Sequence, residues 1–401
     1  MQNSVQRNSY QRKCPNCGAP LRFNPASGRL ACEHCKSETD FDKSDDVSER
    51  DFSEFSEHVK WDESKVSVYR CKNCGASSVL PRTTLATTCP YCSSPVVIDE
   101  NETGLVRPDS LVPFELTEDE AERQLGRWKR RKAYAPNSFR RNGKAHSIKG
   151  VYTPAWTFDF VTSSHYYGRL GRTCTRTVRR NGKTYTETYV KWFDVDGVVE
   201  RVFDDIFVSG NNHIAVKDFE GLNLTDQAKY VVYGDEYLQG YVADNYTVEP
   251  NEAYGIAKRK VDSEIYNGIM REYDADHDGG LKVDTVVVER SFKYMLLPVY
   301  VANSKYRGKL YTQYVSGVYS DRSKNVANVR GKAPVSPWKV LLTVLACIAV
   351  IAGIIAAVIL TSDNWSLDFG GWEFDFRLPP QRLQPLAKSD GMLYNINVNN
   401  L

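Results

Sequence analysis

Eight of the ten cysteines in this sequence fall into four Cys-x-x-Cys pairs. The pairs are Cys14/Cys17, Cys32/Cys35, Cys71/Cys74 and Cys89/Cys92. Two cysteines three positions apart can point both sulfurs at one ion when the backbone between them forms a tight turn, which we call a knuckle. Two knuckles supply the four thiolates of a closed structural zinc site, with Zn–S distances of about 2.3 Å. The spacing therefore predicts two four-cysteine sites, each holding one zinc ion.

The two predicted sites belong to an internal repeat. Residues 14–35 read CPNCGAPLRFNPASGRLACEHC, and residues 71–92 read CKNCGASSVLPRTTLATTCPYC. Fourteen residues separate the inner cysteines in both copies, and every cysteine recurs after 57 residues. Gly18 and Gly75 follow the second cysteine of each copy, where the turn requires a permissive backbone. We interpret the copies as two zinc ribbons, whose folding energy comes mainly from the metal.

Other uses of these cysteines fit the pattern less well. Disulfides need an oxidising compartment, and the opening MQNSVQRNSY lacks the apolar region of a signal peptide, so we expect reduced thiols in the cytoplasm. A rubredoxin-like iron site uses similar knuckles and is the main rival to zinc. Metal sites shared between the copies, and a ligand role for His34, are weaker alternatives. Cys174 and Cys347 are left outside the repeat.

Charge is balanced overall but segregated along the chain. The 401 residues hold 52 Lys and Arg against 50 Asp and Glu, and 41% are hydrophobic. Such a composition supports folded domains and excludes a disordered chain or a histone-like basic coat. Residues 38–63 hold 11 acidic and 3 basic residues, a net charge of −8, whereas residues 105–190 hold 17 basic and 8 acidic residues, a net charge of +9. The sequence thus predicts an acidic linker and a basic body.

One segment is too apolar for a soluble domain. Val340–Leu360 is a stretch of 21 uncharged residues, which as a helix would span about 31 Å, close to the ~30 Å hydrocarbon core of a bilayer. Trp338 and Trp365 flank it as interfacial anchors do. Lys and Arg are frequent before the segment and Asp and Glu after it. We therefore predict a single-pass cell-membrane protein whose N-terminus is cytoplasmic.

These features predict an α+β multidomain chain, with two small β zinc ribbons, a mainly antiparallel-β body containing a few helices, and one transmembrane helix. The expected parts are zinc ribbon 1 (residues 1–40), the acidic linker (41–65), zinc ribbon 2 (66–100), the cytoplasmic body (105–330), the transmembrane helix (338–361) and an extracytoplasmic tail (362–401). Within the body, Thr117 and Glu120 form a capping box that predicts a helix over residues 118–132. Asn181-Gly182 predicts a β-hairpin turn, and a second helix is expected over residues 252–272.

Two further surfaces could bind a partner. The predicted helix over residues 118–132 carries a basic face, made of Arg123, Arg127, Arg130 and Arg131, which is either solvated or contacts anionic lipid or nucleic acid. In the predicted transmembrane helix, Ala349, Gly353 and Ala357 form a stripe of small residues that would permit self-association. No P-loop, nucleophile elbow, zinc-protease or kinase motif is present, so we do not expect an enzyme.

Most of the chain resembles a bacterial family of TFIIB-type zinc-ribbon membrane proteins. The resemblance rests on the two CxNCGA ribbons, the segments RPDSLVPFELTEDEA and GVYTPAWTFDF, and the single late apolar span, and it covers roughly residues 10–360. It implies two four-cysteine zinc sites at the cysteines named above. Members tend to be encoded near SPFH/band-7 and phage-shock-type membrane-stress proteins, which implies an adaptor role. Some are labelled primosomal helicase-like, although this sequence lacks the ATPase motifs of a helicase.

Taken together, these patterns predict a membrane-anchored cytoplasmic scaffold rather than a catalyst. Zinc ribbons on an acidic tether would recruit protein partners at the inner membrane, with the lipid bilayer itself as a further partner. The alternative is a zinc-ribbon protein that binds nucleic acid, which the basic region of residues 105–190 favours and the acidic linker disfavours.

Overall fold

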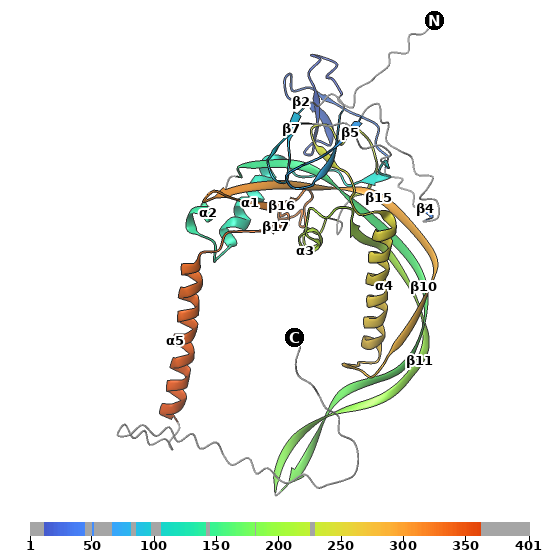
Figure 1. The fold of residues 1–401 in the computed structure, drawn as a ribbon, viewed down its shortest axis with the longest axis vertical. Helices are drawn as coiled ribbons and strands as arrows, with labels where there is room; N and C mark the ends of the chain where they lie inside the picture. The colour runs from blue at the N-terminus through green and yellow to red at the C-terminus, as the bar shows by residue number, and fades with distance from the viewer. Residues whose placement is uncertain are drawn as a thin grey trace. The chain divides into compact units, whose positions relative to one another are not determined.

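The protein comprises two compact units, Met1–Ser336 and Pro337–Leu401. The computed structural model describes residues 12–44, 50–51, 66–81, 86–97, 106–141, 145–180, 182–224 and 229–361. The first unit is mostly β-sheet with a few helices, and the second contains one long helix (Figure 1). The predicted α+β class is therefore confirmed at this level, whereas the predicted domain boundaries stay a prediction.

Three long strands form the centre of the first unit. β10 (Ser147–Arg180) lies between β11 (Lys183–Ser209) and β15 (Lys282–Tyr306) and runs antiparallel to both. The three strands curve together in Figure 1. β10 and β11 form the predicted hairpin, in which Gly182 has a φ of +75°; Asn181 lies outside the described residues.

Short strands extend this sheet. β13 (Val242–Asp244) runs parallel to β10, and β6 (Ser77–Pro81) and β5 (Val66–Arg70) follow it in antiparallel order. Because β5 and β6 lie in the predicted second ribbon (residues 66–100), that ribbon contributes strands to the body sheet. The other strands of the sheet are β4 (Arg50–Asp51), β9 (Ser110–Leu111), β12 (Val231–Val232), β14 (His277–Asp278), β16 (Lys309–Ser316) and β17 (Val329–Gly331).

The first cysteine repeat has a sheet of its own. β1 (Leu21–Asn24), β2 (Arg29–Cys32) and β3 (Glu38–Thr39) pair antiparallel. Within the described residues, these strands do not pair with the body sheet. A separate two-stranded sheet of β7 (Ala86–Thr88) and β8 (Pro95–Val97) completes the second repeat. The two copies of the repeat therefore join the rest of the unit in different ways.

Helix α4 (Pro250–Glu272) lies on the concave side of the long strands (Figure 1) and confirms the helix predicted over residues 252–272. Its buried side chains recur at every fourth position, namely Ala253, Ala257, Val261, Ile265 and Ile269. They pack with Trp156, Phe158 and Phe160 of β10 in one hydrophobic cluster. The spacing of four places these side chains on one stripe of the helix, which is why this face is buried.

Helix α1 (Glu118–Arg131) begins at the predicted capping box. Thr117 N–H donates to Glu120 Oε2 at 2.8 Å, and Glu120 N–H donates to Thr117 Oγ1 at 3.4 Å. Two short helices, α2 (Asn137–Arg141) and α3 (Val216–Glu220), follow along the chain. The prediction of a capped helix over residues 118–132 is confirmed to within one residue.

The second unit contains α5 (Pro337–Thr361). Its segment Pro337–Ala357 has a mean hydropathy of 2.9 and is long and apolar enough to cross a membrane. Residues 362–401, predicted as an extracytoplasmic tail, lie outside the described residues. The cytoplasmic orientation of the N-terminus stays a prediction, as does self-association through Ala349, Gly353 and Ala357.

Candidate metal centres

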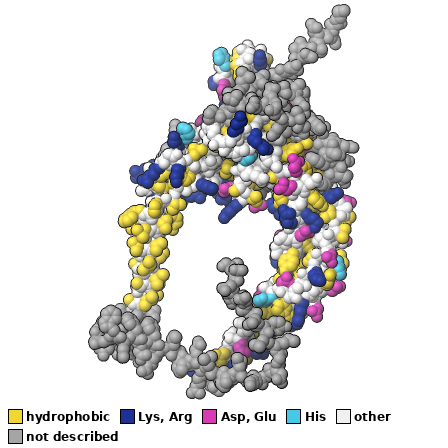
Figure 2. All heavy atoms as spheres, viewed as in Figure 1, with side chains coloured by type: hydrophobic (Ala, Val, Ile, Leu, Met, Phe, Trp, Pro, Cys, Tyr) yellow, Lys and Arg dark blue, Asp and Glu magenta, His cyan; other side chains and the backbone are white. Residues whose placement is uncertain are grey.

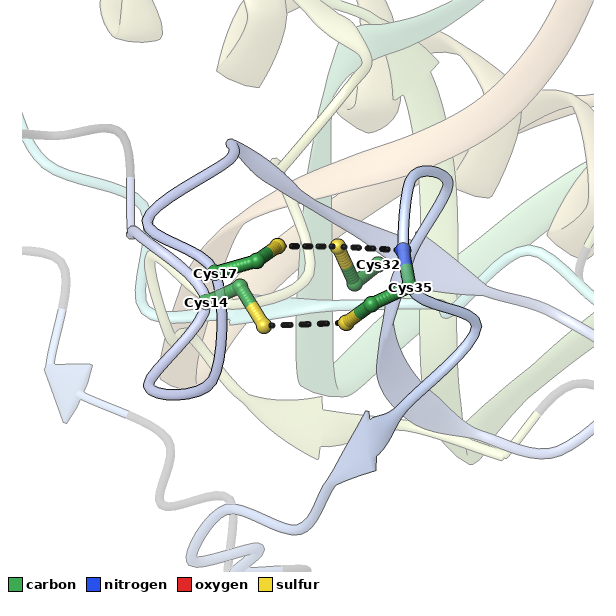
Figure 3. A group of neighbouring side chains, drawn as sticks. All are labelled: Cys14, Cys17, Cys32 and Cys35. Atoms are coloured by element: carbon green, nitrogen blue, oxygen red, sulfur yellow. Dashed lines mark hydrogen bonds between the residues drawn. The ribbon is translucent and has the colours of Figure 1, made fainter.

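The eight predicted cysteines come together in two groups of four. The ligand atoms of each group lie within 4.8 Å of one another, the first group being Cys14, Cys17, Cys32 and Cys35 and the second Cys71, Cys74, Cys89 and Cys92. Figure 3 shows the first group, in which the sulfurs of one knuckle face those of the other. The groups form within each copy of the repeat and not between copies.

The distances between facing sulfurs fit a tetrahedral ion. They are 3.5 Å in the first group (Cys14 to Cys35, Cys17 to Cys32) and 3.6 Å in the second (Cys71 to Cys92, Cys74 to Cys89). Four sulfurs at about 2.3 Å from a central ion would lie roughly 3.8 Å apart, whereas a disulfide bond measures about 2.05 Å. All eight thiols are free. The geometry is therefore consistent with one zinc ion in each group.

The same backbone turn occurs at all four knuckles. In each, an amide N–H donates to the carbonyl of the first cysteine: Gly18 to Cys14 (2.9 Å), Lys36 to Cys32 (2.9 Å), Gly75 to Cys71 (2.7 Å) and Ser93 to Cys89 (3.0 Å). All four donor residues have positive φ, between +58° and +77°. The sequence predicted this conformation at the two glycines, whereas Lys36 and Ser93 adopt it without the freedom of glycine.

A serine stands beside the sulfurs of each group. Ser37 Oγ lies 3.3 Å from Cys14 Sγ and 3.0 Å from Cys35 Sγ, and Ser94 Oγ lies 3.3 Å from Cys92 Sγ. Hydrogen bonding by Ser37 lowers the pKa of the Cys14 thiol to about 6 and also lowers the pKa of Cys35. Thiolate is the form that binds metal. Our sequence analysis missed both serines, although their separation of 57 residues is the same signal that relates the cysteines.

The second group is tied to the body by a buried carboxyl group. Asp244 on β13 accepts hydrogen bonds from Ser78 Oγ on β6, at 2.7 Å, and from the hydroxyl of Tyr91. Asn211 Nδ2 donates to the same carboxyl group at 3.4 Å. Burial raises the pKa of Asp244 to about 7, although the hydrogen bonds from Tyr91 and Ser78 favour its charged form. Since Tyr91 lies between two of the cysteines, this network connects a knuckle directly to the body.

Strand residues of the body also hold this knuckle. Asn303 Nδ2 on β15 donates to the carbonyl of Pro90 at 2.9 Å and to Ser93 Oγ at 3.1 Å. Thr312 Oγ1 on β16 donates to the carbonyl of Tyr91 at 3.4 Å. The knuckle is thereby fixed at both backbone carbonyls between its cysteines, so the second metal centre is a part of the body.

The first ribbon packs against the body through buried side chains that share one hydrophobic cluster with it, several of them from its hairpin. Phe23 on β1 contacts Phe41 and Tyr237, with ring centroids 6.3 Å and 5.2 Å apart, respectively. The Phe23 N–H donates to the carbonyl of Gln239 at 2.9 Å. The knuckle residues Glu33 and His34 are exposed to solvent. The four-cysteine group does not include His34.

A third group of possible ligands is made of carboxylates, which our sequence analysis did not predict. Asp159, Asp204 and Asp205 bring three oxygen ligands together. The Asp205 N–H donates to Asp159 Oδ1 at 2.7 Å, and the ammonium group of Lys293 lies 3.1 Å from Asp205 Oδ1. A single ammonium group offsets only part of the charge of three carboxylates, but acidic side chains commonly lie together without an ion, so we assign the cluster no metal.

Comparison with known proteins finds similarity to a protein of Bacillus subtilis. The chain is 26% identical over 330 residues to the uncharacterized protein YdjG of Bacillus subtilis (strain 168), and the match covers 82% of this chain and 91% of YdjG. No family model matches the sequence. No solved structure matches it either.

Proposed function

We propose that this protein is a membrane-anchored zinc-ribbon scaffold, in which each four-cysteine group binds one zinc ion and the exposed first ribbon recruits protein partners at the cytoplasmic face. The observation that carries the proposal is the closed shell of each group. Four sulfurs complete the tetrahedral coordination of zinc and leave no open position for a substrate or an activated water. Such sites stabilise structure, so we expect binding to occur on the protein surface around them.

The two ribbons differ in the surface that they leave free. In the second ribbon, Pro90 and Tyr91 are buried in the body. In the first ribbon, the equivalent residues Glu33 and His34 are exposed. The other knuckle is exposed in both ribbons. The first ribbon therefore supports the recruitment of a partner, and the second supports the body.

The charges of the first ribbon favour a protein partner over nucleic acid. Its arginines form ion pairs with carboxylates, namely Arg12 with Glu236, Arg22 with Glu33 and Arg29 with Asp40. A ribbon that contacts phosphates needs positive charge that is not already neutralised. The resemblance to TFIIB-type zinc-ribbon membrane proteins suggests that the partners are SPFH/band-7 or phage-shock-type proteins of the membrane-stress response.

The test is capture of crosslinked partners from native membranes with the full-length protein. We compare the natural chain with Glu33→Ala/His34→Ala, which alters the exposed knuckle and leaves every cysteine in place. The matched control is Glu264→Ala/Asn267→Ala, an acidic and a polar residue on the exposed face of α4. Elemental analysis should find two zinc ions per chain in all three proteins.

We expect the knuckle variant to lose most of the captured partner and the control to retain it. Equal capture by all three proteins would contradict recruitment through the first ribbon. Partners that disappear after nuclease treatment would instead support the nucleic-acid function. Absence of bound metal, or iron in place of zinc, would overturn the assignment of the ion.

A further inference from the structure

The corner between α1 and α2, residues 127–141, concentrates positive charge. It holds seven Lys and Arg residues and no Asp or Glu. The exposed members of this set are Arg127, Arg130, Arg131, Lys132 and Arg141. In Figure 2, Lys and Arg side chains gather over α1 and α2. We call this surface the α1–α2 corner.

Contacts within the corner fix its shape. Arg140 on α2 donates from Nε and Nη2 to the carbonyl of Arg130 at the end of α1, at 3.1 Å and 2.7 Å. The ammonium group of Lys132 lies 4.4 Å from the ring centroid of Trp128. Cations near the C-terminus of a helix also interact favourably with its dipole. The basic groups are therefore presented on a preformed surface and not on a free loop.

The corner is joined to the residue that precedes the apolar helix. Ser336 N–H donates to the carbonyl of Tyr134 at 2.8 Å. Pro337 begins α5, and the uncharged stretch begins at Val340. Four residues reach about 14 Å when extended and about 6 Å as helix. The covalent chain alone therefore keeps Tyr134 close to the point where an apolar span would enter the membrane, whatever direction the helix takes.

The length of this four-residue link is comparable to the range over which charges attract in salt solution. At physiological ionic strength the Debye length is about 8 Å, and basic residues within that range of an anionic leaflet are attracted to it. Tyr134 is 50% exposed and Trp338 66% exposed. Aromatic side chains of this kind are enriched at membrane interfaces. The positive charge of the α1–α2 corner, its short covalent link to α5 and the exposed ring of Tyr134 therefore all favour a membrane surface as what the corner binds.

We propose that the α1–α2 corner docks on the anionic headgroups of the bilayer in which α5 is anchored. This inference rests on the membrane anchoring in our proposed function. Docking would hold the body against the leaflet, so that the exposed first ribbon is presented at a restricted range of heights above it. Anionic lipid is favoured over nucleic acid because the link from Tyr134 through Ser336 to α5 brings the corner to a lipid surface.

Full-length protein in lipid nanodiscs tests the proposal. We would measure hydrogen exchange of residues 130–141 in nanodiscs of phosphatidylcholine alone and in nanodiscs containing about one third phosphatidylglycerol. The anionic lipid should slow exchange at least tenfold, and high salt should remove this protection. The test variant is Arg130→Glu/Arg131→Glu/Lys132→Glu. The matched control, Arg176→Glu/Arg179→Glu/Arg180→Glu, makes the same change in net charge near the tip of the β10–β11 hairpin.

We expect the test variant to lose the protection and the control to retain it. Each basic residue at an anionic surface contributes about a fivefold effect, so three together contribute about a hundredfold. Arg130→Gln/Arg131→Gln/Lys132→Gln, which does not introduce repulsion, should show a partial loss while zinc content and exchange of α4 stay unchanged. Protection that is equal in neutral and anionic nanodiscs, or that persists in the Glu variant, would overturn the docking.

Two further results separate this inference from the proposals on which it rests. Protection of the corner by added RNA in neutral nanodiscs would assign the surface to nucleic acid and overturn lipid docking. A chain that does not incorporate into nanodiscs would overturn the anchoring by α5, and the inference with it. Partner capture by the first ribbon is measured separately, so a failure there leaves a positive result at the corner intact.

Discussion

The two copies of the cysteine repeat have the same knuckles but different surroundings. In the second copy, β6 pairs with β13 of the body, and Tyr91 reaches the buried Asp244. In the first copy the three strands form a separate sheet, and the residue equivalent to Tyr91, His34, is exposed. One four-cysteine module is therefore built into the body sheet in the second copy, whereas in the first copy it forms its own sheet and exposes a knuckle to solvent.

The thiols themselves do not follow this division. Hydrogen bonding by Ser37 lowers the pKa of Cys14 to about 6 in the first copy, and hydrogen bonds from Asn73 and Ser94 outweigh burial and lower the pKa of Cys92 to about 6 in the second. Burial raises the pKa of Cys74 to about 11, and the pKa of Cys17 in the first copy is raised to about 12. The two groups are therefore alike as candidate metal ligands, and the copies differ in how they join the body.

Removal of each metal centre should produce the largest difference between the copies. Structural zinc sites contribute on the order of 10 kcal/mol to the folding of small modules. Because β5 and β6 belong to the body sheet, Cys74→Ser/Cys92→Ser should unfold much of the first unit. Cys17→Ser/Cys35→Ser should release one zinc and unfold the first ribbon only. Thermal unfolding, hydrogen exchange and elemental analysis of the two variants would measure this difference.

Equal destabilisation of the first unit by the two pairs of substitutions would contradict this difference between the copies. If the first pair also lowered the melting temperature of the body strands by more than a few degrees, the first ribbon would be as integral as the second.

Asp244 should make the second copy sensitive to pH in a way that the first is not. Its pKa is raised from the ordinary 3.8 to about 7, so the folded state retains a proton that the unfolded state has lost. The free energy of unfolding should therefore fall as the pH rises from about 4 to about 7 and level off above 7. The expected slope approaches 1.4 kcal/mol per pH unit.

Denaturant unfolding of the natural chain and of Asp244→Asn between pH 5 and pH 8 would measure this contribution, since metal ligation and the other groups are common to both. The unfolding free energy of the natural chain minus that of the variant should fall by roughly 2 kcal/mol from pH 5 to pH 7. A difference that is constant with pH would mean that Asp244 does not titrate in this range.

The equivalent residues Tyr91 and His34 allow a matched substitution in the two copies. Tyr91→Phe removes the donor to Asp244 and should lower the free energy of unfolding by about 1–3 kcal/mol. His34→Phe changes an exposed side chain and should stay within about 0.5 kcal/mol. Denaturant titration of both variants checks the pair, and a comparable loss in the two would show that the first knuckle is packed as tightly as the second.

The smallest predicted effect concerns the glycines of the knuckles. Gly18 and Gly75 have φ values of +74° and +77°, and a Cβ atom at either position would meet no atom within 4 Å. Alanine at either position should therefore cost only the backbone strain, about 1–2 kcal/mol. Gly75→Ala should lower the stability of the whole first unit. Gly18→Ala should speed hydrogen exchange in the first ribbon alone, and an effect on the body would contradict the division between the copies.

Local patterns were sufficient to predict much of this fold. The capping box at Thr117 and Glu120, the turn at Gly182 and the helix over residues 252–272 each depend on residues close together in the chain. The eight cysteines were likewise predictable, because ligand type, spacing and repetition are properties of the sequence. Ser37 and Ser94 could have been found by the same comparison of the copies.

The attachment of the second ribbon could not be predicted in this way. β13 has only three residues, too few for a periodic signal, and Asp244 meets Ser78 across 166 positions of the chain. The hydrogen bond from Ser336 to Tyr134 joins residues that are even farther apart in the sequence. Such pairings depend on which segments the long strands bring together.

The sequence alone therefore determined the chemistry of this protein: two sets of four thiolates, an apolar segment long enough for a bilayer, and a basic helix end. The tertiary structure decided that the two identical knuckle frameworks have different roles, since one is built into the body sheet and the other remains at the surface. The physical reason is that ligand geometry is set by contacts within about twenty residues, whereas burial is set by packing between segments that the sequence separates.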